Sequence, residues 1–562
     1  MKTHMVSRIP LPLIYFLGIW VILNAFQAWL TPLDPDEAYY WIYSQFPAWG
    51  YFDHPPMVAL MIKAGSSWLP GAIGLRMITV LFMPLTLLML WQLADRPEKP
   101  SELYLFLLLA AAMPFFHVYG FVATPDAPLL FFSAAWFLAF RKFLASPNMS
   151  LTLILGILMA LLLYSKYHGV LVIGFSVLAN LRLLRMPYFW LSGIFGLILF
   201  IPHLYWQYAQ GFPTFAYHLV GRDDEWEIKL PLNYLLNQAL IFSPLLFPFL
   251  LKAIASKLTQ GRRSLEVALI AGFWLFFAAM TFKGHVEPQW TAVLSIPVVL
   301  LLHEYVKNNE LQSKLIRNMA LVSVFLMVLA RLGIMTGLLR SNKLFGNTDW
   351  VLELQEKAMG LPLYFENSYR DAAMYAFYTG TQPSTFTNID YRANQYNLLD
   401  LEIPLHNQRV MVVGQRKWNC SDCRVDTLSN GHIVKLLVTD SLQVSENCRI
   451  IVENIPEIWA AGDTLVLDAV IENPYPFDIQ LGKGNLPLSI GLLLHDGEKW
   501  VEEVTAVYLG SEQLRLVPKA KQTVPLRWVV PKVKGTFKAA LGFRPGNLLP
   551  AVNSDLYLIT IE

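Results

Sequence analysis

Long apolar runs recur along the first 340 residues of this chain, and they constrain its fold more than any other feature. A helix needs roughly 20 residues to cross the hydrocarbon core of a bilayer, and about eleven runs approach that length. With 55% hydrophobic and only 15% charged residues, the sequence predicts a polytopic α-helical membrane protein. The runs are residues 9–30, 71–93, 103–119, 127–144, 151–164, 169–181, 188–205, 232–251, 265–282, 290–305 and 319–339.

The first run is followed by an acidic stretch and lacks a small-residue cleavage site, which predicts a retained helix and not a removed signal peptide. Lys and Arg residues then occupy every second connection between the runs. Cytoplasmic loops are enriched in these residues, so those connections are predicted to be cytoplasmic and the others, with everything after Leu339, to face outward. The basic positions include Lys2 and Arg8, Arg96 and Lys99, Arg141 and Lys142, Arg182 and Arg185, Lys252 and Lys257, and Lys307 and Lys314.

The outward connections hold nearly all of the polar side chains that could take part in catalysis or binding. Ionisable side chains against a membrane are costly to desolvate and usually mark a site, although a solvated loop with aromatics at the headgroup level is the alternative. The candidates are Asp36, Glu37, Asp53 and His54 after the first run, Asp126 in FVATPDAP, Lys166 and His168 in YSKYHG, and Lys283, His285 and Glu287 in FKGHVEPQW. Arg331, inside the last run, is predicted either to neutralise a carboxylate or to snorkel outward.

The sequence pattern changes after Leu339. Alternating strand-like and helix-like segments predict a small extracytoplasmic α/β domain at residues 341–447, with strands at LPLYFEN, PSTFTNI and RVMVVGQ and a helix at SYRDAAMYAFYTG. Residues 448–562 contain only strand-like segments, which predicts an immunoglobulin-like β-sandwich. Cys420 and Cys423 form a C-x-x-C spacing, and with Cys448 they predict a disulfide or free thiols in preference to a zinc site.

Several classes of protein are disfavoured. The chain has no phosphate-binding GxxxxGK[ST], no GxGxxG between a strand and a helix, and no HExxH, which argues against a nucleotide-driven pump or a zinc protease of that kind. The net charge of +2 and the lack of a basic stripe with interleaved aromatics predict no nucleic-acid partner.

Five segments together carry a family resemblance: DPDEAYYW, GYFDHPPMV, ATPDAPLLF, YSKYHGVL and KGHVEPQW. In their order and spacing, the chain resembles the bacterial family 39 glycosyltransferases, relatives of the protein O-mannosyltransferases and of the lipid A aminoarabinose transferases. The resemblance implies a GT-C transmembrane domain at residues 1–340 in the bacterial inner membrane, with the later domains on the periplasmic side. It also implies a polyprenyl-phosphate-linked sugar as donor and a protein, lipid or glycan as acceptor.

Transfer from a lipid phosphate needs a base for the acceptor hydroxyl and cations around the departing phosphate. Asp36 resembles the family's catalytic carboxylate and is predicted to be that base in one inverting displacement, with Asp53 and Asp126 at the family's second and third acidic positions. Lys166 is the leading phosphate ligand, supported by His54, Lys283 and His285, while Glu37, Tyr40 and Glu287 are candidate substrate contacts. His54 stands where aminoarabinose-handling relatives tend to carry lysine. A divalent metal ion at the acidic positions is left open.

Two other classes remain as alternatives. A polytopic transporter would use the outer carboxylates to bind cations, but transporters commonly show duplicated halves and midplane sites on broken helices, which this sequence does not show clearly. A catalytically silent sugar-binding scaffold would rely on the β-sandwich. The presence of all three acidic positions and Lys166 argues against the scaffold.

Overall fold

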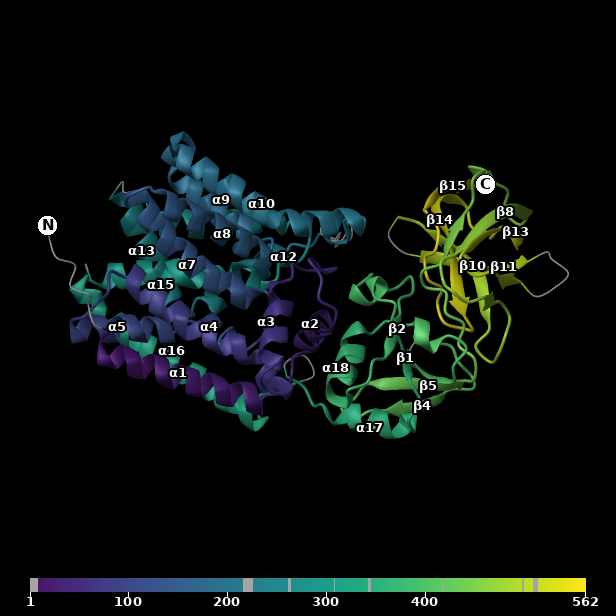
Figure 1. Cartoon of the computed structure of the whole chain (residues 1–562), viewed down its shortest axis with the longest axis horizontal. Coiled ribbons are helices and arrows are strands. Elements are labelled where there is room, and N and C mark those ends of the chain that lie inside the picture. The colour runs from purple at the N-terminus through teal and green to yellow at the C-terminus, as the bar shows by residue number, and fades with distance from the viewer. Residues whose placement is uncertain are drawn as a thin grey trace. The chain divides into compact units, whose positions relative to one another are not determined.

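The computed structural model describes residues 9–215, 226–260, 264–307, 309–341, 345–416, 418–497, 500–508 and 514–562 (Figure 1). Lys2 and Arg8, which helped to predict the orientation, lie outside the described residues. The chain divides into two compact units, Met1–Gly346 and Asn347–Glu562. The first unit is helical and the second is rich in β-strands, as the sequence predicted.

Six helical segments of the first unit, among the described residues, are long and apolar enough to cross a membrane: α1 (Leu11–Leu30), α4 (Gly71–Leu93), α7 (Asp126–Ala145), α10 (Pro187–Ala209), the continuous segment Pro288–Lys307 that ends in α15 (Ser295–Lys307), and α16 (Glu310–Thr336). The polytopic membrane class is confirmed. Shorter apolar helices accompany them, so the number eleven stays a prediction. They are α3 (Met57–Ser66), α5 (Pro100–Ala111), α8 (Met149–Ser165), α9 (Gly169–Ala179) and α14 (Leu265–Met280).

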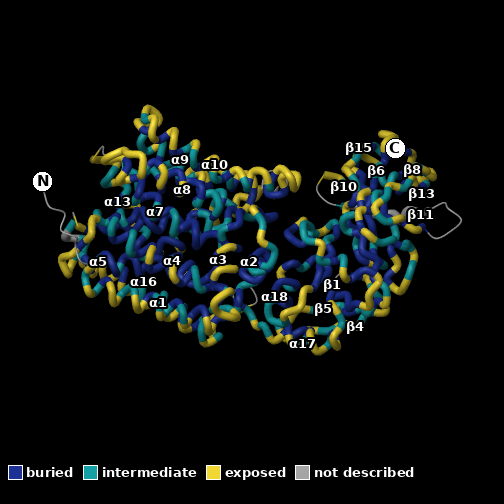
Figure 2. Tube along the Cα trace, in the orientation of Figure 1, coloured by how far each residue is buried: buried dark blue, intermediate teal, exposed yellow. Residues whose placement is uncertain are grey.

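The remaining helices of this unit are α2 (Pro35–Gln45), α6 (Pro114–Val118), α12 (Lys229–Ile241) and α13 (Phe247–Thr259). The bundle packs α7 against α4 and α8, and α8 along α10. Where α8 meets α10, a Cβ added at Gly156 would lie 2.8 Å from the Ser192 carbonyl oxygen. Small residues of this kind let helix backbones approach closely in membranes. In Figure 2, buried residues lie in the interior of the helical unit and exposed residues lie on its outer surface, which suits contact with lipid.

The second unit contains a five-stranded sheet in the order β2-β1-β3-β5-β4. β1 (Leu363–Glu366) lies parallel to β2 (Ser384–Phe386) and β3 (Val410–Gln415), and β3 is antiparallel to β5 (Ile433–Thr439), which pairs with β4 (Arg424–Thr427). α17 (Asp349–Ala358) precedes β1, and α18 (Tyr369–Thr379) connects β1 to β2. β1, β2, β3 and α18 lie in the segments that the sequence predicted, whereas β4 and β5 were not predicted.

The rest of the second unit is built on an eight-stranded sheet in the order β6-β8-β13-β11-β10-β14-β15-β7. Its strands are β6 (Arg449–Ile451), β7 (Ile458–Trp459), β8 (Thr464–Asn473), β10 (Leu488–His495), β11 (Trp500–Tyr508), β13 (Ala520–Val529), β14 (Gly535–Pro545) and β15 (Tyr557–Ile561), and β9 (Ile479–Gln480) pairs separately with β12 (Arg515–Leu516). The boundary at residue 447 and the immunoglobulin-like class stay predictions.

The cysteines of the second unit form one disulfide, between Cys420 and Cys423, and Cys448 is a buried thiol. Among the residues described, no group of three or more His, Cys, Asp or Glu side chains is arranged to hold a metal ion. The disulfide is therefore the alternative that the structure supports.

Candidate active site

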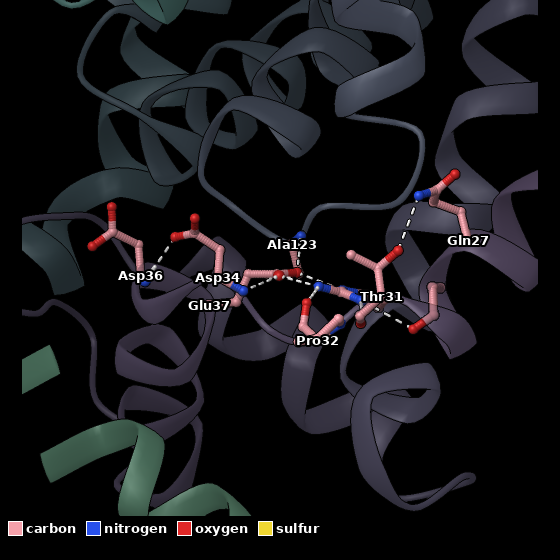
Figure 3. Close-up of polar contacts among 9 residues, drawn as sticks. Gln27, Thr31, Pro32, Asp34, Asp36, Glu37 and Ala123 are labelled. Atoms are coloured by element: carbon pink, nitrogen blue, oxygen red, sulfur yellow. Dashed lines mark hydrogen bonds and ion pairs between the residues drawn. The ribbon is translucent and has the colours of Figure 1, made fainter. Parts of the chain in front are cut away.

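The first turn of α2 presents Asp36. Asp34 caps this helix: its Oδ1 accepts the Asp36 backbone N–H at 2.9 Å, and Pro35 starts the helix with a φ that suits its first turn. Asp36 is half-buried, and Figure 3 shows its carboxylate directed away from the neighbouring Glu37. A capped helix start thus fixes the predicted base without enclosing it.

Glu37 and Arg76 form a fully buried ion pair (Figure 3). Arg76 Nε donates to Glu37 Oε1 at 2.8 Å, and Nη2 donates to Oε2. Glu37 also accepts the backbone N–H of Asp34 at 3.0 Å and that of Ala123 at 2.8 Å. The other guanidinium hydrogens go to backbone carbonyls, those of Ala28, Thr31 and Pro32.

This pair corrects one prediction. Glu37 was a candidate substrate contact, but its carboxylate is enclosed and bonded to four protein N–H groups. Its role in the structure is to tie the start of α2 to Arg76 and to the loop that ends at Asp126. Adjacency to Asp36 could not reveal this, because consecutive residues on a helix point in different directions.

Arg76→Gln is expected to lower the free energy of unfolding by about 3 to 5 kcal/mol, because it leaves a buried carboxylate without its cation. Thermal unfolding of the purified protein in detergent would measure the change. Arg141→Gln is the matched control: its partner Asp95 is 86% exposed, and exposed ion pairs contribute little. Equal small losses for both variants would show that the Glu37–Arg76 pair is not a stabilising scaffold.

Asp53 lies in the loop between α2 and α3, and two side chains of α2 hydrogen-bond to its carboxylate. Its Oδ2 accepts the hydroxyls of Tyr39 at 2.9 Å and Tyr43 at 3.1 Å, and the carboxylate is buried. The ring of Tyr40 meets the ring of His54 edge-on at 5.6 Å. The structure therefore joins Asp53, His54 and Tyr40 through aromatic side chains of one helix face.

Asp126 and Lys166, 40 residues apart in sequence, meet as a buried ion pair. Lys166 Nζ donates to Oδ1 at 2.7 Å and to Oδ2 at 2.9 Å. Asp126 starts α7, and Lys166 lies in the break between α8 and α9 with an extended backbone, φ −163° and ψ 145°. The break between the two helices thus places an ammonium beside a carboxylate.

The loop after α14 carries the remaining candidates. Glu287 faces His285, with 3.7 Å between Oε2 and Nε2, and both side chains are partly exposed. Lys283, just after α14, is exposed. The 283–290 loop thus places Glu287 beside His285, whereas the Lys283 side chain lies at the surface.

The structural roles of several other residues were not predicted from the sequence. Arg76 is a charge inside an apolar run, which alone marks it as unusual. No sequence feature marked Tyr43, or the buried polar residues His203 and Gln207 near the end of α10, as part of the site. Arg331 is buried and donates to neutral acceptors, Gln27 Oε1 at 3.1 Å and Asn24 Oδ1 at 2.9 Å, so the two alternatives predicted for it, pairing with a carboxylate and snorkelling, were both wrong.

Comparison with known proteins supports the family resemblance. Residues 53–206 match the family model described as dolichyl-phosphate-mannose-protein mannosyltransferase. In a search of curated proteins, none matched the chain.

Two crystal structures of ArnT from Cupriavidus metallidurans are similar to this fold. The structure bound to undecaprenyl phosphate has 15% sequence identity and a TM-score of 0.56, covering 75% of this chain and 97% of that one. The apo structure gives 15% identity, a TM-score of 0.54 and the same coverage. The chain therefore has the GT-C fold, as its sequence resemblance predicted.

Proposed function

We propose that this protein is a glycosyltransferase that moves a monosaccharide from a polyprenyl phosphate to a hydroxyl of a protein, lipid or glycan acceptor. The buried Asp126–Lys166 pair at a helix break carries the proposal, because it places a cation directly beside a carboxylate. The residues matched to the mannosyltransferase model include Asp53, Asp126 and Lys166. The ArnT structure bound to undecaprenyl phosphate supports a polyprenyl carrier.

In the proposed step, Asp36 accepts the proton of the acceptor hydroxyl as its oxygen attacks the anomeric carbon. The bond from that carbon to the phosphate oxygen breaks, and the lipid phosphate leaves with the electron pair. Attack from the opposite face inverts the configuration. A positioned base contributes about 10² to 10⁴ in rate.

The departing phosphate gains negative charge, which Lys166 is proposed to stabilise. Asp126 holds the Lys166 ammonium at 2.7 Å and so acts as a positioning residue for it. His54, Lys283 and His285 are proposed as further phosphate contacts, and Tyr40 and Glu287 as substrate contacts. Asp53, fixed by two phenols, is proposed to orient the acceptor or the sugar.

The transporter alternative requires outer carboxylates that can bind a cation. Asp126 is already neutralised by Lys166, and Asp53 accepts two phenolic hydrogen bonds. These contacts favour fixed polar groups of a transferase over an exchangeable cation site.

The proposed reaction can be tested with purified protein in liposomes containing polyprenyl-phosphate sugars and an envelope extract. The expected result is release of polyprenyl phosphate together with a new glycoform, identified by mass spectrometry of proteins and glycolipids. Envelopes from cells lacking the chain should then lack that glycoform. Identical glycoform profiles with and without the chain, and no release of polyprenyl phosphate, would refute the proposal.

The site is proposed to face the periplasm of a bacterial inner membrane. Lys283 and Arg96 are both exposed and lie in connections predicted to face opposite sides. A membrane-impermeant maleimide added outside should label Lys283→Cys and not Arg96→Cys. Labelling of both from the same side would overturn the orientation.

A further inference from the structure

The end of α10 and the turn after it hold the backbone of Trp49, Gly50 and Tyr51, in the loop that leads to Asp53. The Trp49 carbonyl oxygen lies 2.7 Å from His203 Nδ1, and Thr214 Oγ1 donates to the Tyr51 carbonyl oxygen at 3.2 Å. Between these two contacts, the indole of Trp206 covers Gly50: a Cβ at Gly50 would lie 2.3 Å from the ring. Only glycine fits beneath it.

These contacts belong to one chain of hydrogen bonds, in which the Gln207 amide nitrogen donates in both directions, toward Tyr167 and toward Thr214. Because the Trp49 carbonyl can only accept, His203 Nδ1 carries the proton, and Nε2 accepts the Tyr167 hydroxyl at 2.8 Å. The Tyr167 oxygen accepts from Gln207 Nε2 at 3.0 Å, and the same amide nitrogen donates to Thr214 Oγ1 at 2.7 Å. The two ends of this hydrogen-bond chain are backbone carbonyl oxygens of the 46–56 loop, those of Trp49 and Tyr51.

This hydrogen-bond chain requires several polar side chains to be buried, which costs desolvation free energy. His203 and Gln207 are fully buried in α10, one of the candidate spans, and Thr214 is buried as well. Polar side chains within membrane spans are expensive to desolvate and mark functional positions by default. Tyr167 stands at the centre of the chain and directly follows Lys166 in the break between α8 and α9.

We propose that Tyr167, His203 and Gln207 are positioning residues that set the distance between the loop carrying Asp53 and His54 and the break carrying Lys166. This inference rests on the proposed function for its kinetic consequence. Reacting groups must be held closely to be productive, and a misplacement of about 1 Å can cost on the order of 100-fold in rate. α10 thus serves as the common support on which both parts of the site are aligned.

Tyr167→Phe tests the proposal, because it removes the hydroxyl that links His203 to Gln207 and keeps the ring. Tyr164→Phe is the matched control: its hydroxyl donates from α8 to the Leu199 carbonyl of α10 at 2.8 Å but does not belong to the chain. For Tyr167→Phe we expect kcat of sugar transfer to fall about three- to tenfold, the range for one buried neutral hydrogen bond, with the donor KM unchanged. Tyr164→Phe should leave kcat near the native value.

Two substitutions of His203 test whether the residue must bond to both Trp49 and Tyr167 or whether its bond to Trp49 is enough. The Asn amide nitrogen in His203→Asn takes the place of Nδ1 and keeps the bond to Trp49, whereas the amide oxygen in His203→Gln reaches the place of Nε2 and keeps the bond to Tyr167. If the chain must be continuous, both variants lower kcat to a similar extent. Native kcat in His203→Asn would show that the contact with Trp49 suffices and would overturn the proposal.

A second readout needs no catalysis. Ala48→Cys lies next to the backbone of residues 49–51 and is introduced in a Cys448→Ser background. Its rate of reaction with a maleimide reports the mobility of this loop. Tyr167→Phe should raise that rate at least about threefold, the lower range for loss of one hydrogen bond, and Tyr164→Phe should not. An unchanged rate in Tyr167→Phe overturns the coupling, even in a preparation that transfers sugar. A raised rate in a protein without transferase activity would instead support the coupling and refute the proposed function.

Discussion

Asp36→Asn is expected to abolish nearly all sugar transfer while the protein still folds and binds polyprenyl phosphate. The substitution keeps the size of the side chain and removes its ability to take a proton, so transfer should fall by about 10² to 10⁴. The Glu37–Arg76 pair and the Asp34 cap are left in place, which is why the start of α2 should keep its structure. Turnover and polyprenyl phosphate binding, measured on the same preparation, would separate chemistry from binding.

Other carboxylates provide the comparison for this prediction. Asp95→Asn changes an exposed carboxylate and should leave transfer unaffected. Asp53→Asn should weaken the positioning of acceptor or sugar, raising KM as well as lowering the rate. Near-normal transfer by folded Asp36→Asn would refute its assignment as the base, and a collapse confined to Asp53→Asn would move the base to that position.

Lys166→Met is expected to have two large effects that a second substitution can separate. Loss of a preorganised cation near the phosphate should remove about 2 to 4 kcal/mol of transition-state stabilisation. Loss of the partner of buried Asp126 should also lower the free energy of unfolding by about 3 to 5 kcal/mol. Transfer kinetics and thermal unfolding in detergent measure the two effects independently.

The double variant Lys166→Met with Asp126→Asn removes the uncompensated charge. Its stability should recover toward the native value, since replacing both members of a buried ion pair is far less costly than removing one. Its transfer activity should remain low, because the cation is still missing. Lys229→Met, whose ion pair with Glu227 is exposed, is the control and should change neither property. Recovery of transfer in the double variant would show that Lys166 serves only to neutralise Asp126.

Some elements of the fold followed from local sequence. The spacing of apolar residues located α18 and the strands β1 and β3. These features depend on residues within about one turn or one strand of each other, so periodicity captures them. The capping box at Asp34 that starts α2 is also local, but it was not predicted.

Pairings between distant elements did not follow. The sequence marked both Asp126 and Lys166 but not their contact, and it gave Glu37 a substrate role that its bond to Arg76 excludes. Trp49 and His203, 154 residues apart, meet only because α10 packs beside α8 and the 46–56 loop. Which buried polar groups satisfy one another depends on how helices are rotated and packed, and this is not encoded within any single segment.

The sequence by itself determined that the chain is a polytopic helical membrane protein with a β-rich C-terminal part and polar segments gathered between its spans. Transfer of apolar side chains out of water is nearly additive along the chain, so composition and run length were enough. The tertiary structure alone decided which of the polar groups are scaffold and which remain candidates for chemistry. A charge buried in protein must find partners from other elements, and only packing shows that Arg76 has Glu37, that Lys166 has Asp126, and that Arg331 is held by neutral amides.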